Sequence, residues 1–179
     1  MSAAPIDAGL AGARLPGLRA RIRQASPSWR VGTAGAVLWA AAMAASAATN
    51  LTLAGWGTGR HVATVALVFA LSASLAFPLG FAAANLLAGK RHPEARFAAA
   101  LLCFTAATLG ITAVFYALDY RQYYANWHAE PLSAVWLIQL AFTTAGALVQ
   151  FAVTGVRLYF PIGFLALLLV SLWFARRAR

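Results

Sequence analysis

The sequence predicts an all-α protein, a polytopic transmembrane helical bundle of about five spans. Of its 179 residues, 62% are hydrophobic and only 10% are charged, whereas a soluble domain has about 45–50% apolar and about 25% charged residues. A soluble chain of this size cannot bury so much apolar side chain, because a domain of ~150 residues hides only about 70% of its surface. The composition therefore excludes a soluble enzyme, a disulfide scaffold and a disordered chain.

Five charge-free runs carry the transmembrane prediction. A helix needs about 20 apolar residues to cross ~30 Å of hydrocarbon, and its backbone groups must be paired within the segment. The charged residues separate the runs 31–59, 62–89, 97–118, 131–156 and 158–175. We expect spans at about 31–56, 62–89, 97–118, 132–155 and 158–175. The last run is the shortest, and the alternative is four spans with a re-entrant segment that starts at Pro161.

A basic segment, residues 1–30, precedes the first run. Leu15, Leu18 and Ile22 are spaced three and four residues apart, which predicts an amphipathic surface helix over roughly 17–25. A basic tail that only fixes the orientation of the chain is the alternative. The basic residues of the chain lie beside the ends of apolar runs, as the positive-inside rule and anionic lipid headgroups favour. We therefore expect anionic headgroups, and not nucleic acid, as their partners.

The orientation prediction follows from the same rule. With segment 1–30 in the cytoplasm, the basic loop 90–96 also lies inside and the 119–130 loop lies outside. A fifth span then puts Arg157 inside and the basic tail, 176–179, outside, against the rule. Thirteen arginines, one lysine and abundant alanine are typical of a GC-rich bacterial genome. We therefore expect a multi-pass protein of the bacterial inner membrane with a cytoplasmic N-terminus.

Polar residues form one stripe on each of two predicted spans. Helical spacing places Thr105, Thr108 and Thr112 on one face of the third span. The stripe on the fourth span consists of Gly146 and three polar residues, Gln139, Thr143 and Gln150. We expect the stripes to hydrogen-bond helices across the bundle interior; a hydrated groove for a polar headgroup or small solute is the alternative. The spans contain no charged residue, which argues against a proton relay or an ion-coupled site.

The segment after the third span, residues 119–131, is the most distinctive stretch of the chain. Four aromatic residues at positions i, i+3, i+4 and i+7 would share one face of a short helix: Tyr120, Tyr123, Tyr124 and Trp127. Such a helix would lie flat in the outer headgroup layer as an aromatic anchor. The alternative is a binding platform for a lipid headgroup or a sugar, in which those aromatic residues act with Asp119, Arg121, His128 and Glu130.

Motifs for catalysis, metals or cofactors are missing from the sequence. Cys103 is the only cysteine, so no CxxC pair can form. Asp119, His128 and Glu130 lack a metal-ligand spacing such as HExxH. His61 and His128 lie outside the predicted spans and on the same side, which argues against a bis-histidine haem. We therefore predict no catalytic residue, no metal and no cofactor, and we favour a protein that is not an enzyme.

Near the end of the fourth span, Gln150-Phe151 is followed by Arg157-Leu158-Tyr159-Phe160. This short segment resembles the asparagine–phenylalanine, basic, aromatic ending of a span in GtrA-like proteins, which are small polytopic proteins linked to moving polyprenyl-linked sugars. Glutamine replaces the asparagine, the spacing is one residue longer, and a further apolar run follows. The resemblance implies a small transporter or flippase-like protein for a lipid-linked polar headgroup.

The leading functional hypothesis is a non-enzymatic accessory or assembly subunit of a larger membrane complex. The chain is small, its predicted spans carry no charged residue, and alanine-rich faces such as that of residues 40–48 suit close packing of helices. The expected partners are the lipid bilayer with its anionic headgroups, and either another membrane protein or a second copy of this chain. The transporter or flippase is the alternative.

Overall fold

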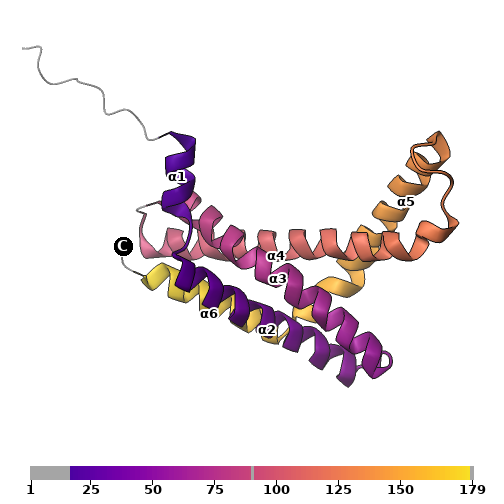
Figure 1. The fold of residues 1–179 in the computed structure, drawn as a ribbon. Coiled ribbons are helices and arrows are strands. Elements are labelled where there is room, and N and C mark those ends of the chain that lie inside the picture. Colours follow the sequence, from indigo (N-terminus) through magenta and orange to yellow (C-terminus); the bar gives the residue numbers. More distant parts are fainter. Residues whose placement is uncertain (1–16, 90, 178–179) are drawn as a thin grey trace, which may run out of the picture.

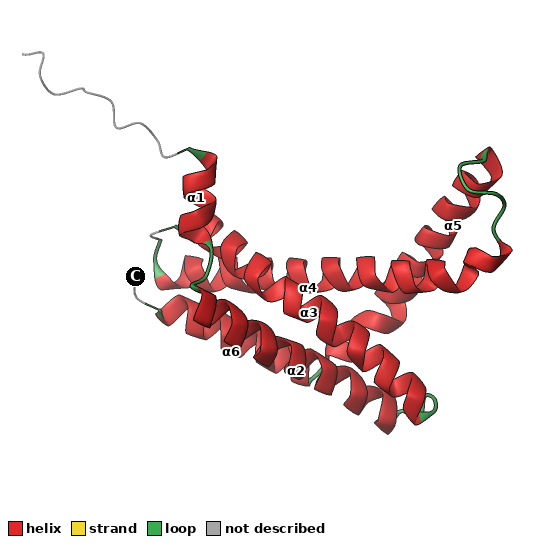
Figure 2. Cartoon of the chain, viewed as in Figure 1, coloured by secondary structure: helices red, strands yellow, loops and turns green. Residues whose placement is uncertain are grey.

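The computed structural model describes residues 17–89 and 91–177, and all regular structure within them is helical (Figures 1 and 2). This confirms the predicted all-α fold class. The α-helices are α1 (Leu18–Ala25), α2 (Trp29–Leu53), α3 (Gly59–Ala88), α4 (Pro93–Tyr124), α5 (Ala134–Gln150) and α6 (Ile162–Arg176). A 3-10 turn, η1 (Ala125–Trp127), follows α4; a π-helical turn, η2 (Phe151–Gly155), and a second 3-10 turn, η3 (Val156–Tyr159), connect α5 to α6.

Four helical stretches are long and apolar enough to cross a membrane: Trp29–Leu53, Gly59–Ala88, Pro93–Trp127 and Ala134–Tyr159. They correspond to the first four predicted spans. The fifth charge-free run forms only α6, which has 15 residues and measures about 22 Å at 1.5 Å per residue. That length is shorter than the ~30 Å hydrocarbon layer.

The fifth predicted span, 158–175, falls on η3 and the shorter helix α6, whose path leads back along α2. Figure 1 shows α6 alongside α2, with its C-terminal end at the end of the bundle where α2 and α4 begin. Arg96, in the first turn of α4, fixes this position, because its Nη2 donates hydrogen bonds to the carbonyl oxygens of Phe174 and Arg177 at 3.0 and 3.1 Å. Helix α6 therefore runs back to the end of the bundle where α2 and α4 begin, and both ends of the described chain lie at that end.

The interruption between α5 and α6 has a local cause in the sequence. Pro161 has no amide hydrogen and disfavours helical backbone at the preceding Phe160, so α6 starts at Ile162. Gly155 is buried, and a Cβ there would collide with the ring of Phe151. The chain thus replaces a straight helix by a π turn and a 3-10 turn before α6 begins.

Aromatic side chains fill the core between α2, α3, α4 and α6. Trp39, Phe77, Phe81, Phe104 and Phe174 form one cluster, with neighbouring ring centroids 5.4–6.3 Å apart. Small residues let the helices approach these rings, as aligned small residues do in membrane bundles. This cluster packs together the helices that carry the polar side chains of the interior.

The two ends of the bundle differ in their side chains. What we call the basic end comprises α1, the start of α2, the α3–α4 loop and the end of α6. Its described arginines are Arg19, Arg21, Arg23, Arg30, Arg91, Arg96, Arg176 and Arg177. The opposite end, called the aromatic end, carries the α2–α3 loop and the segment after α4. The guanidinium of Arg157 lies 5.1 Å from the ring of Trp56 in the α2–α3 loop, so Arg157 belongs to the aromatic end, which corrects its expected position beside the basic loops.

Candidate functional site

A chain of hydroxyl groups crosses the centre of the bundle. Thr112 of α4 donates a hydrogen bond to Ser72 of α3 at 2.8 Å, and it accepts one from the Tyr159 hydroxyl at 2.6 Å. One turn earlier in α4, Thr108 accepts a hydrogen bond from the indole Nε1 of Trp39 at 3.0 Å. Both threonines were predicted to face the interior, and both are buried. Their partners come from α2, α3 and η3, and not from the stripe on α5.

Two polar residues of α2 pair the backbone of the α5–α6 interruption. Ser46 donates a hydrogen bond to the carbonyl oxygen of Leu158 at 2.8 Å and accepts one from the Gly163 amide at 3.2 Å. Asn50, one turn further along α2, donates to the carbonyl oxygens of Leu158 and Phe160 at 3.2 and 2.7 Å. In a lipid environment an unpaired backbone group costs several kcal/mol, and these contacts supply partners for backbone groups that the helix break leaves open.

The sequence patterns did not predict a role for Ser46, Asn50, Ser72 or Trp39, and Tyr159 was named only within the segment Arg157–Phe160. The available signal was weak: Ser46 and Asn50 are the polar pair spaced four apart in the second half of the first charge-free run. Such a pair marks a helix face but does not identify its partner. The hydrogen bonds join residues 40–117 positions apart in the chain.

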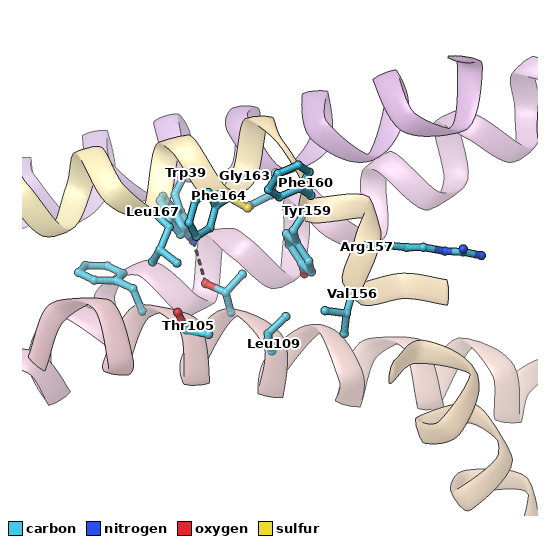
Figure 3. A pocket seen from close by; sticks show the side chains of 13 residues that line it. Trp39, Thr105, Leu109, Val156, Arg157, Tyr159, Phe160, Gly163, Phe164 and Leu167 are labelled. Atoms are coloured by element: carbon cyan, nitrogen blue, oxygen red, sulfur yellow. Dashed lines mark hydrogen bonds between the residues drawn. The ribbon is translucent and has the colours of Figure 1, made fainter. Parts of the chain in front are cut away.

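Beside the hydroxyl chain lies a cavity of about 330 Å³ between α2, α4, η3 and α6 (Figure 3). Met43, Phe104, Leu109, Phe164 and Leu167 are among its lining residues. Thr105, the third member of the predicted stripe on α4, also lines it. Thr108 does too, but its hydroxyl is bonded to Trp39, as the dashed line in Figure 3 shows, and the guanidinium of Arg157 extends away from the cavity. The cavity is therefore suited to apolar groups, such as part of an acyl chain.

The predicted polar stripe on α5 divides into two parts. Gln139 accepts a hydrogen bond from the backbone amide of Ala129 at 2.8 Å, and Thr143 lies 3.2 Å from the Nε2 of His128. These two side chains hold the segment after α4 against α5, and they do not bridge two long helices. Gln150, by contrast, is exposed on α5, and its side chain makes no hydrogen bond within the described residues.

The predicted outer platform is a continuation of α4 and not a separate surface helix. The rings of Tyr120 and Tyr124 contact each other in a tilted arrangement along the end of α4, with centroids 4.8 Å apart, and Trp127 lies 5.5 Å from Tyr123 and 6.1 Å from Tyr124. Arg121 is placed over the ring of Trp136 of α5, 5.5 Å from its centroid. The aromatic residues thus form one cluster at the aromatic end, as their spacing predicts.

The polar members of that platform do not converge. His128 is turned toward Thr143, while Asp119 and Glu130 are exposed. Within residues 17–89 and 91–177, no group of three His, Cys, Asp or Glu side chains could hold a metal ion. Comparison of the chain with family models, with curated proteins and with solved structures found no match. What the geometry offers is a hydrogen-bonded interior, an apolar cavity and an aromatic end.

Proposed function

We propose that the protein is a non-enzymatic accessory or assembly subunit of a larger membrane complex, and that α5 is its docking helix. The observation that carries this proposal is how little α5 packs on its own bundle. Ala147 is the only buried residue of this 17-residue helix, whereas α3 buries ten of its 30 residues. Figure 1 shows the N-terminal half of α5 leaning away from the other helices.

Helix association in lipid depends on packing and on interhelical hydrogen bonds, because the lipid is as apolar as the side chains. A helix that packs so little gains little stability from its own bundle. Gly146 leaves open space where a partner backbone could approach, and Gln150, one turn later, exposes an amide that has no hydrogen-bond partner among the described residues. An interhelical hydrogen bond from such an amide is worth about 0.6–2 kcal/mol. The stripe Gly146–Gln150 therefore favours docking of a helix from a partner.

We further propose that the basic end faces the cytoplasm of a bacterial cell and that the protein resides in the inner membrane. Eight described arginines lie at the basic end, and three, Arg60, Arg121 and Arg157, lie at the aromatic end. The positive-inside rule favours the end with more arginines for the cytoplasm. The rule is then satisfied by all the loops and by the end of α6, which the five-span topology did not allow.

Site-specific crosslinking in native membranes tests the docking proposal. In a Cys103→Ser background, Gln150→Cys should crosslink to one partner protein, or to a second copy, in stoichiometric yield. Leu71→Cys is the matched control, because Leu71 is a half-exposed position on α3, away from α5. Gln150→Leu should reduce recovery of the same partner in mild detergent. Equal crosslinking at both positions, or purification with lipid alone, would contradict the subunit proposal.

A small transporter or flippase-like protein for a lipid-linked polar headgroup is the second candidate. The observation that favours it is the interrupted α5–α6 path, since discontinuous helices form the substrate sites of many transporters. The carbonyl oxygens of Leu158 and Phe160 are, however, occupied by Ser46 and Asn50. Recovery of a lipid-linked polar compound without any protein partner would support this candidate over the first.

A further inference from the structure

A polar cavity of about 210 Å³ lies at the basic end of the bundle. It lies between the end of α1, the α1–α2 linker, α3, the start of α4 and the end of α6. Six polar side chains line it: Gln24, Ser26, Ser28, Asn85, Arg96 and Arg177. The lining thus contains two guanidinium groups, and no carboxylate side chain is found among its described residues. Its polar lining sets it apart from the apolar cavity beside Trp39.

Arg96 supplies a fixed positive charge in the wall of this cavity. Its side chain is 8% exposed, and its Nη2 is held by the carbonyl oxygens of Phe174 and Arg177. The ring of Phe174 lies 5.0 Å from the guanidinium carbon. The Nη1 of Arg96 also donates to the carbonyl oxygen of Gly89 at 3.4 Å, so Arg96 contributes chiefly its positive charge to the wall.

Arg177 contributes the second charge and the available hydrogen-bond donors. Its guanidinium carbon lies 5.7 Å from the ring centroid of Phe81 and 5.2 Å from that of Trp173. Its side chain makes no hydrogen bond or ion pair with any described residue. A guanidinium presents five N–H donors in a planar fork that matches the oxygens of a phosphate. The two rings orient this fork without using its donors.

The start of α2 completes the wall. Asn85 donates a hydrogen bond to the carbonyl oxygen of Ala25 at 2.7 Å, and this contact holds the α1–α2 linker against α3. Ser28 is the N-cap residue of α2, and its hydroxyl makes no capping hydrogen bond. The N-terminus of a 25-residue helix carries a partial positive charge and unpaired amide groups, both of which favour an anion.

We propose that this cavity binds a phosphate group. The Arg177 guanidinium, the Ser28 hydroxyl and the N-terminus of α2 offer donors to a phosphate oxygen, and Arg96 adds a positive charge beside them. The phosphate of an anionic lipid headgroup and free inorganic phosphate share this chemistry. The site is independent of the docking helix α5, which leans away at the other end of the molecule.

Binding to the purified full chain in detergent tests this site and distinguishes the two sources. Phosphatidylglycerol and diacylglycerol, which share acyl chains but differ in the phosphate, are titrated by native mass spectrometry. Inorganic phosphate is titrated separately by calorimetry. We expect phosphatidylglycerol to bind and diacylglycerol not to bind. Tight binding of inorganic phosphate with weak binding of the lipid would identify the free ion as the ligand of the same site.

Three variants locate the bound phosphate. Arg177→Gln should weaken binding by about tenfold or more, the value expected for loss of a charged hydrogen bond. Ser28→Asp keeps a good N-cap residue but adds a negative charge to the wall, so it should weaken binding without lowering the melting temperature. Arg176→Gln removes the same charge from the neighbouring position, which does not line the cavity, and should change binding by less than about twofold. Equal losses in Arg176→Gln and Arg177→Gln would overturn the proposal, as would equal binding of both lipids with no binding of inorganic phosphate.

Discussion

The hydroxyl of Tyr159 donates a 2.6 Å hydrogen bond to Thr112, and this contact ties the interruption between α5 and α6 to the middle of α4. Thr112 in turn donates a hydrogen bond to Ser72 of α3. Tyr159 also packs its ring on Phe69, with centroids 4.8 Å apart. One side chain in a 3-10 turn thus links the return path of the chain to two of the long helices.

Tyr159→Phe should destabilise the protein while keeping its packing. The substitution removes only the hydroxyl, and interhelical hydrogen bonds of this kind are worth about 0.6–2 kcal/mol. The expected result is a lower melting temperature in detergent. Tyr123→Phe is the control, because Tyr123 is exposed at the aromatic end and makes only ring contacts. Equal melting temperatures for the two variants would show that the hydroxyl contributes nothing to the fold.

Asn50→Leu should lower the free energy of unfolding more than Tyr159→Phe does. Asn50 pairs two carbonyl oxygens of the interruption, those of Leu158 and Phe160, and no other described residue pairs the Phe160 oxygen. This oxygen is exposed on the bundle, and an unpaired backbone group in a lipid environment costs several kcal/mol. Thr52→Val is the control on the same helix, because the Thr52 hydroxyl bonds only to backbone within α2. A thermal unfolding series of the two variants and the wild type measures the difference.

Gly35→Ala should strongly lower the stability of the protein, and Gly110→Ala should not lower it. A Cβ at Gly35 would collide with the ring of Phe77, whereas a Cβ at Gly110 meets open space. Overpacking of a core costs about 1–3 kcal/mol, while alanine is a better helix former than glycine by about 1 kcal/mol. In urea or thermal unfolding, the change in stability relative to the wild type should therefore have opposite signs in the two variants. A neutral Gly35→Ala would mean that α2 and α3 separate easily at this contact.

The sequence predicted the long helices well because membrane helices depend on local composition. Charges at Arg60, Lys90 and Arg96 bound the second and third runs, and α3 and the start of α4 follow those bounds closely. Pro161 likewise marked the start of a shorter segment. The positions of Thr108 and Thr112 in the interior were also predicted, because they share a helix face.

The partners of these residues could not be predicted. Trp39 and Thr108 are 69 positions apart, and hydropathy carries no information on which helices become neighbours. The direction of α6 depends on Ser46 and Asn50, which pair backbone groups of the α5–α6 interruption. These long-range contacts cannot be read from the sequence, so the 18-residue charge-free run was interpreted as a separate span. Gln139 and Thr143 have helical spacing that suits a long-helix interface, but a nearby loop supplies their partners.

The return of the chain to the basic end through α6 is the central claim, and labelling of single cysteines in sealed spheroplasts tests it most directly. In a Cys103→Ser background, cysteines replace three exposed residues, Arg91, Gln122 and Arg176. A maleimide that does not cross membranes should label position 122 and leave positions 91 and 176 unlabelled until the membrane is opened. Labelling of position 176 together with position 122 would contradict the account, since α6 would then be a fifth complete span.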